Sequence, residues 1–228
     1  MRFSSLVGSS AAAAVLVASS ASATAAENPH LLAARHHLPH PEPPHHFHHD
    51  AVHHALDDAA AGGERYVADV LYHHNVHRRN HSAPDLHYHF ALADTAERIA
   101  RTCNFEHQMQ YDGGEYGQNI AAGVPWQGVS FVISDLWYNN EVEYYSRLYG
   151  IPDPTFDKKW GHFTQMVWKR TTHVGCYTQH CPNGVENAPG TYDYTVCNYR
   201  RQGNIRGQYA KNIGKPRRDH TVHGDRGS

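Results

Sequence analysis

Four cysteines constrain this 228-residue chain most strongly: Cys103, Cys176, Cys181 and Cys197. An even number of cysteines in an exported protein predicts disulfide bonds, which restrict how distant segments can be arranged. Four cysteines allow three pairings, and their spacing selects none of them. Zinc ligation is the alternative, but the spacings lack two close Cys-x-x-Cys pairs. We therefore expect disulfides, provided that the chain is exported.

The first 26 residues have the pattern of a secretory signal peptide. Arg2 supplies the positive start, an apolar run covers residues 11–17, and small residues such as Ala23 and Ala25 follow. The run is shorter than the ~20 residues that a membrane-spanning helix needs, and no later stretch is long enough. We expect a secreted, extracellular protein without a transmembrane anchor.

The chain has a formal net charge of −2 at neutral pH and contains 22 histidines. It lacks the basic balance typical of nucleic-acid binding, so nucleic acid is not an expected partner. Because an unperturbed imidazole titrates near pH ~6.5, the chain becomes cationic in mild acid.

Residues 27–62 form a low-complexity leader. Ten histidines and four prolines lie within residues 30–54, with few large apolar side chains. Such a segment cannot bury enough apolar surface to offset its ordering entropy, so we expect disorder. Its histidines can chelate copper or zinc, although a solubilising linker or a removed pro-segment explains the composition equally well. The folded domain is expected at residues 63–216, followed by a frayed polar tail at 217–228.

Helical periodicity marks the first half of this domain. Residues 64–79 place Val67 and Val70 on one side, and residues 90–103 repeat apolar side chains at helical spacing. A third helix is expected over residues 128–145, where Ile133, Trp137 and Glu141 share one face.

Strand patterns mark the second half. Residues 162–168 alternate, so that His162, Thr164, Met166 and Trp168 would face one side of a strand. Residues 173–179 and 192–199 form two further expected strands, separated by a stretch rich in Gly and Pro. Helices followed by strands predict an α+β fold, with helices packed on a small antiparallel sheet.

An ordered set of motifs within residues 64–216 resembles the CAP superfamily (SCP/TAPS, pathogenesis-related-1-like proteins), and fungal secreted members most of all. The set is His74-Asn75 with Arg78, Cys103-x-Phe105-x-His107, Tyr116-Gly-Gln-Asn-Ile-Ala121, Trp137-Tyr138, Gly161-His-Phe-Thr-Gln-Met-Val-Trp168, Tyr192-Asp-Tyr-Thr-Val-Cys-Asn-Tyr199 and Gly207-Gln-Tyr-Ala-Lys-Asn-Ile213. The resemblance implies a three-layer α-β-α sandwich with a central antiparallel sheet. It also implies disulfides Cys103–Cys181 and Cys176–Cys197, the first closing a loop worth on the order of 4 kcal/mol.

The resemblance further implies a surface cleft with two histidines and two acidic positions. In this chain these positions are His107, Gln118, Glu141 and His162. Two imidazoles beside a carboxylate suit Zn²⁺, whereas hydrogen bonding that joins helices to sheet is the alternative role. Gln118 stands where the family has Glu, so we expect weak zinc binding and no required cofactor. Glu141 is preferred over Glu143 because it shares the face of Trp137.

We do not expect an enzyme. A metal-dependent hydrolase needs a general base beside the metal, and Gln118 cannot serve as one. No catalytic residue is therefore assigned, and hydrolysis in this cleft is the alternative function. A rigid scaffold for a host or cell-surface receptor is another.

An aromatic-rich loop is the second candidate binding surface. Its apolar residues are Tyr144, Tyr145, Leu148, Tyr149, Ile151, Phe156 and Trp160. The corresponding loop of fungal relatives is associated with sterols, and a neighbouring helical groove with fatty acids. Aromatic walls suit a flat apolar ligand, although packing of the loop on its own domain explains many of these rings. We therefore expect a monomer that binds a sterol or fatty-acid type lipid.

Two further features lie near the start of the domain. Asn80-His81-Ser82 matches the acceptor pattern for N-glycosylation at Asn80, which requires an exposed loop. His73, His74, His77 and His81 are near helical spacing and can extend a metal-binding cluster, but we favour a structural role for His74.

Overall fold

The computed structural model describes residues 16–19 and 63–227. Its helices are α2 (Gly63–Asn80), α3 (Phe90–Ala100), α4 (Val129–Phe131), α5 (Gly161–Met166) and α6 (Tyr209–Asn212), with a π-helical segment η3 (Val132–Asn139) continuing α4. Its strands are β1 (Leu16–Ser19), β2 (His87–Tyr88), β3 (Gly117–Ala122), β4 (His173–His180) and β5 (Asp193–Arg200). The leader, and the signal peptide except for β1, lie outside the described residues.

The strands form one sheet in the order β1-β3-β5-β4-β2. Strand β5 is antiparallel to both of its neighbours, β3 and β4, with Gln118 opposite Asn198 and Cys176 opposite Cys197. The two-residue strand β2 runs parallel to β4, so the sheet is mixed at that edge. The α+β fold and the expected strands at 173–179 and 192–199 are confirmed.

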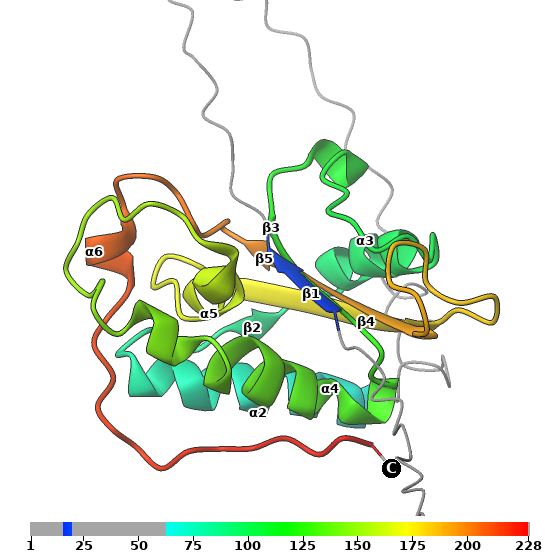
Figure 1. Ribbon diagram of the computed structural model, residues 1–228, viewed down its shortest axis with the longest axis horizontal. Coiled ribbons are helices and arrows are strands. Elements are labelled where there is room, and N and C mark those ends of the chain that lie inside the picture. The colour runs from blue at the N-terminus through cyan, green and yellow to red at the C-terminus, as the bar shows by residue number, and fades with distance from the viewer. Residues whose placement is uncertain (1–15, 20–62, 228) are drawn as a thin grey trace, which may run out of the picture.

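Helices cover both faces of the sheet. Figure 1 shows α3 on one side of the strands, and α2 with α4 on the other. The start of α3 lies so close to β4 that a side chain at Gly175 would meet the backbone nitrogen of Ala93 at 2.3 Å. Glycine is therefore required there for the helix to approach the strand. The resulting three layers match the predicted sandwich.

The guanidinium of Arg78 joins α2 to the loops around α5 and β2. It is fully buried. Its Nε donates to the carbonyl of Pro84, its Nη1 to the carbonyls of Met166 and Trp168, and its Nη2 to the carbonyl of Thr171, at 2.7–3.0 Å. Burial lowers the pKa of Arg78 to about 10, so the side chain stays charged at neutral pH.

The strand expected at residues 162–168 is wrong, because residues 161–166 form helix α5. Alternation of polar and apolar residues normally marks a half-buried strand, but every residue of α5 is buried. The polar ones are satisfied inside the fold: Thr164 Oγ1 hydrogen-bonds Asn204 Oδ1 at 2.6 Å, and Gln165 Oε1 accepts from the Gly203 N–H. Sequence alternation therefore carried no information about the backbone here.

The predicted helices differ from the structure mainly at their ends. Helix α2 spans the predicted range, whereas α3 ends at Ala100, before Cys103. The third helix, expected to continue to residue 145, ends at Asn139 after its π-helical turns, and a 3-10 segment follows at Val142–Tyr145. Ile133, Trp137 and Glu141 are nevertheless all buried.

The two disulfides have the predicted pairing. Cys103 is bonded to Cys181 and ties the end of α3 to the end of β4, while Cys176–Cys197 joins the neighbouring strands β4 and β5. No free cysteine is found in the described part of the chain.

The tail expected to be frayed is instead ordered along the helical layer through residue 227. Asp135 contacts both His223 Nδ1 and the Gly224 N–H, and Asp225 bonds Ser130. A side chain at Gly224 would meet the backbone of Ser130 and Phe131 at 2.1 Å. This strap (residues 215–227) closes over α4 and η3 because its glycine allows backbone-to-backbone contact (Figure 1).

Replacing Arg78 with Met tests its role as the link between segments. The variant removes the guanidinium donors from the carbonyls of Pro84, Met166 and Thr171, while the Trp168 carbonyl keeps the backbone hydrogen bond that it accepts from residue 171. We expect unfolding free energy to fall by at least about 3 kcal/mol. The matched control is Arg79→Met, which removes only an exposed ion pair to Asp85 and should cost less than about 1 kcal/mol. Urea denaturation measures both, and equal small losses would contradict the assigned role.

Candidate functional site

His162 and Glu141 form a buried pair in the predicted cleft. Helix α5 supplies His162, and Glu141 lies between η3 and the 3-10 segment η4 (Val142–Tyr145), with Glu143 exposed. His162 Nδ1 lies 2.5 Å from Glu141 Oε1, and Glu141 Oε2 accepts from the Phe163 N–H at 3.0 Å. Trp137 stacks on the imidazole with ring centroids 5.8 Å apart. Both carboxylate oxygens are thus engaged in fixing α5 against the preceding segment.

His107 and Gln118 form the second pair, within a chain of amides. The Oε1 of Gln118 accepts from His107 Nδ1 at 3.0 Å and from the Gln108 N–H. Its Nε2 donates to Asn198 Oδ1, and Asn198 Nδ2 donates to the Leu92 carbonyl. The Gln108 N–H at one end and the Leu92 carbonyl at the other fix which amide atom is the oxygen and which the nitrogen in Gln118 and Asn198. Gln118 therefore uses both the acceptor oxygen and the donor nitrogen of its amide, whereas an ionised carboxylate has no donor.

The two pairs meet at β3 but lie on opposite faces of that strand. Gln118 bonds toward α3, whereas its neighbour Asn119 donates to the His162 carbonyl at 3.3 Å. Among residues 63–227, no three His, Cys, Asp or Glu side chains are grouped so that they can hold a metal ion. The donor set of the cleft therefore does not fit Zn²⁺ as it stands: its one carboxylate is engaged and its fourth position is an amide.

The histidines of α2 are buried within the helical layer. His74 bonds the Val70 carbonyl and Tyr199 Oη, so it has the structural role favoured above. His73 and His77 both contact Ser134 Oγ at 2.7 Å, and His81 bonds Tyr138 and the Gly214 carbonyl. Burial is the largest cause that lowers the pKa of His74 and His77 to about 3 and of His81 to about 4. These imidazoles are therefore neutral inside the fold.

The predicted lipid loop divides into core and surface residues. Tyr145 and Trp160 are buried core residues, and Leu148, Tyr149 and Phe156 pack partly against them. Tyr144 and Ile151 remain 60% and 41% exposed. The buried rings hold the loop in place, and the exposed ones are available to a ligand.

A pocket of about 310 Å³ lies beside this loop, lined by Asp153, Pro154, Thr155, Phe156, Asn204, Arg206 and Tyr209. Phe156 and Tyr209 both pack edge-on against Trp160, with ring centroids 5.1 and 5.5 Å away. At its rim, Arg206 Nε bonds Asp153 Oδ2 at 2.8 Å. Sequence pattern did not indicate Asn204, Arg206 or Tyr209 as lining residues, because they are distant from the loop in sequence and meet it only in the folded domain.

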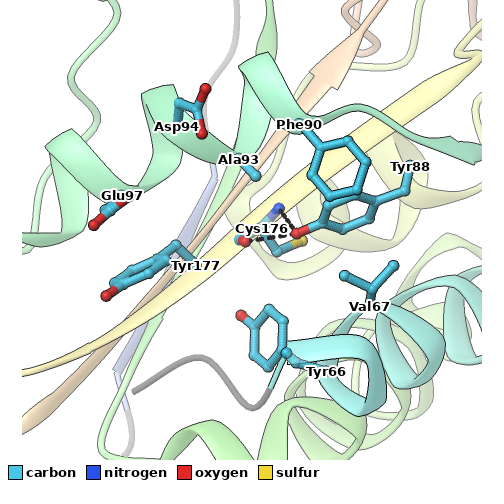
Figure 2. Close-up of a pocket in the computed structure, with 10 residues that line it drawn as sticks. Tyr66, Val67, Tyr88, Phe90, Ala93, Asp94, Glu97, Cys176 and Tyr177 are labelled. Atoms are coloured by element: carbon cyan, nitrogen blue, oxygen red, sulfur yellow. Dashed lines mark hydrogen bonds between the residues drawn. The ribbon is translucent and has the colours of Figure 1, made fainter. Parts of the chain in front are cut away.

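A second pocket lies between α2, α3 and β4 and is shown in Figure 2. Its volume is about 20 Å³, which accommodates about one water molecule. Tyr66, Tyr88 and Tyr177 surround it, and Tyr88 Oη bonds the Cys176 carbonyl. This pocket is too small for a lipid.

The strap covers the predicted glycosylation pattern. Asn80 Nδ2 donates to Tyr138 Oη, and Asn80 Oδ1 accepts from the Arg217 N–H at 2.9 Å. Arg217 also bonds Ser82. A glycan on Asn80 Nδ2 would need the space now occupied by Tyr138, so Asn80 in the folded domain lacks the exposed position that the prediction required.

A family model described as "CAP: Cysteine-rich secretory protein family" matches residues 71–199, more than half of the chain. A probable pathogenesis-related protein of Arthroderma benhamiae is 48% identical over 147 residues, which cover 64% of this chain and 48% of that protein. Protein PRY2 of Saccharomyces cerevisiae is 32% identical, covering 65% of this chain and 41% of its own length. The chain thus spans about half, or less, of the curated relatives it matches.

The solved structure titled "Crystal structure of NaASP2 with Zn2+" has a TM-score of 0.56 and 23% identity, covering 71% of this chain and 92% of that one. This similarity concerns the fold. A Candida albicans relative, 31% identical over 63% of this chain and 37% of its own length, is named "Secreted protein RBT4". Within residues 63–227, no helix is long and apolar enough to cross a membrane.

The buried histidines predict loss of stability in mild acid. Between pH ~6.5 and their lowered folded-state pKa values, the unfolded chain takes up protons that the folded chain does not. The free energy of unfolding therefore decreases as the pH is lowered through this range. Each of His74, His77 and His81 contributes at most about 1.4 kcal/mol per pH unit. Urea unfolding at pH 7 and pH 5 measures this slope, which His77→Gln should reduce and His220→Gln, in the exposed tail, should not. A flat profile would be inconsistent with neutral buried imidazoles.

Replacing Gln118 with Glu tests the amide chain. At pH 7 the carboxylate faces Asn198 Oδ1 without a donor, and we expect a loss of about 1–3 kcal/mol in unfolding free energy relative to wild type. The difference should shrink toward pH 4, where a protonated Glu donates again. Exposed Gln110→Glu is the matched control. A Gln118→Glu variant as stable as wild type at pH 7 would refute the network.

Proposed function

Since the chain belongs to the cysteine-rich secretory protein (CAP) family, we propose that it is a secreted, non-enzymatic protein that binds a sterol or similar apolar lipid in the pocket beside residues 144–160. The name of the Candida albicans relative, "Secreted protein RBT4", supports secretion. The signal-peptide pattern of residues 1–26 supports it independently.

The observation that carries the proposal is the pocket itself. At about 310 Å³ it is at the lower end of the ~300–1,000 Å³ range of small-molecule sites. Its aromatic walls, Phe156 and Tyr209, are held edge-on by the buried Trp160. A rigid ring-lined wall suits a flat apolar ligand because little side-chain entropy is lost on binding.

Exposed apolar side chains border the same region. Four large hydrophobic residues are well exposed in the described chain, and two of them, Tyr144 and Ile151, belong to this loop. Contact with a lipid would remove their apolar surface from water, at ~25 cal/mol per Å². The polar Arg206–Asp153 pair at the rim offers hydrogen bonds to a hydroxyl head group.

Hydrolysis is disfavoured by burial of the cleft. A His–Glu pair can orient an imidazole for base catalysis, but His162 is 1% and Glu141 5% exposed. A substrate therefore cannot reach the pair without rearrangement of α5. Both thiol pairs are oxidised to disulfides, which removes cysteine nucleophiles from the described chain.

Titration of the full secreted chain with radiolabelled cholesterol tests the proposal. We expect saturable binding that Thr155→Trp weakens at least tenfold, because the new ring fills the pocket from an exposed position. Ile151→Ser should weaken binding about tenfold through lost apolar contact.

The control is a pair of matched surface substitutions. Tyr144→Ser lies on the loop and should lower affinity, whereas Tyr192→Ser, at a similarly exposed tyrosine elsewhere, should leave it unchanged. Absence of saturable binding by the wild type, or equal losses in both tyrosine variants, would overturn the proposal. Trp160 is unsuitable for this test because it belongs to the core.

A further inference from the structure

Four basic side chains line up across one end of the sheet. His87 on β2 is the register partner of His173 on β4, and His173 is the partner of Arg200 on β5. Register partners lie on the same face of a sheet, so the three side chains form a row. His89 follows His87 by two residues and joins that face by the same alternation.

Backbone hydrogen bonds fix the position of His173 between the two other histidines. The N–H of His87 donates to the Thr172 carbonyl, and the N–H of His89 donates to the Val174 carbonyl. The ring centroid of His173 consequently lies 5.9 Å from that of His87 and 5.4 Å from that of His89. The three imidazoles are neighbours because of strand pairing.

The row carries no compensating ion pair. Within residues 63–227, none of the four basic side chains forms a salt bridge with a carboxylate. Burial lowers the pKa of His173, and the neighbouring His89, His87 and Arg200 lower it further. Protonation therefore brings like charges together, and an anion between them would relieve the repulsion.

The remaining charged groups lie on the α3 side. Asp94 on α3 interacts electrostatically with His89. Asp112 and Glu115 line the pocket that adjoins His89 and Arg200, but Asp112 is engaged with Arg98. Within residues 63–227, none of these three carboxylates forms a salt bridge with the row.

We propose that His87, His89, His173 and Arg200 form a pH-dependent binding site for a tetrahedral oxyanion, a sulfate or a phosphate ester. Arg200 supplies a permanent charge and a planar set of donors. His89 Nδ1 accepts from the Leu92 N–H at 3.4 Å, so its Nε2 is the nitrogen left to donate. Imidazoles that become protonated in acid add positive charge and N–H donors. The orientation of His173 suits this role. Because the Thr172 hydroxyl donates to the Arg200 carbonyl, its Oγ1 accepts the hydrogen bond from His173 Nδ1–H. His173 Nε2 is therefore the nitrogen left for an anion. The site uses no residue of the lipid pocket and does not depend on it.

Inorganic sulfate is the sharpest probe because it stays dianionic across the relevant pH range. The experiment follows the histidine ring signals of the full, isotope-labelled chain by NMR during sulfate titration at constant ionic strength. We expect saturable shifts of His87, His89 and His173 at pH 5.5, with affinity at least about tenfold higher than at pH 7.5. Resolved signals separate this site from the histidines of the leader.

Variants distinguish a built site from general attraction to a cationic chain. Exposed Arg200→Gln and His173→Gln should each weaken binding about tenfold, the effect of losing a charge-assisted hydrogen bond. His180→Gln, at the other end of β4 and paired with Asp193, should change nothing. Uniform shifts across all histidines, equal affinity at both pH values, or indifference to Arg200→Gln would each overturn the proposal.

Two sources of the oxyanion can be separated in the same way. At pH 5.5, vesicles of phosphatidylcholine with phosphatidic acid are compared with glycerol phosphate at equal phosphate-ester concentration. Tighter, Arg200-dependent binding to the vesicles identifies a lipid head group, and equal binding identifies a free anion. Binding to neither probe would refute the phosphate-ester assignment.

Discussion

The fold depends on one buried cation. Arg78 donates to four backbone carbonyls, one at Pro84 and three within residues 166–171. Three of those carbonyls lie outside helices and strands, and the fourth belongs to Met166, the last residue of α5. A buried guanidinium is costly to desolvate unless its donors are fully used, and here they hold α2, the turn before β2 and the end of α5 in fixed positions.

The cleft and the pocket beside the loop follow from the same framework but offer different chemistry. In the cleft, Glu141 contacts His162, and Gln118 hydrogen-bonds His107 and Asn198. These contacts join the layers of the fold. In the pocket, Trp160 is fixed by the core, while Phe156 and Tyr209 present apolar edges to an open volume. The proposed binding role therefore rests on the pocket and not on the cleft.

Much of the fold could be predicted from local pattern or resemblance. The amphipathic repeat of α2 and the bounded runs of β4 and β5 were sufficient, and the resemblance gave both disulfides. Helix α5 was missed because all of its residues are buried, so polarity did not report on the backbone. Strand β3 was recognised only as a motif, since Gly-Gln-Asn-Ile-Ala-Ala lacks the β-branched alternation of a surface strand.

Site residues were predictable where a motif held them and unpredictable where tertiary contact created them. The resemblance named His107, Gln118, Glu141 and His162 but not their contacts, and Asn198 as partner of Gln118 depends on strand register. The row of His87, His173 and Arg200 likewise exists only once β2, β4 and β5 are paired. The ordered strap was missed because short polar tails are usually frayed, and its backbone contacts at Gly224 have no signature in sequence.

The central claim is that the domain carries an apolar lipid in the pocket at residues 153–156. Its most direct test is quantitative mass spectrometry of organic extracts from the purified, secreted full chain, without added ligand. The account predicts about one sterol or fatty-acyl molecule per protein, displaceable by excess sterol. A preparation that is free of lipid, and remains so after exposure to a lipid mixture, would contradict it.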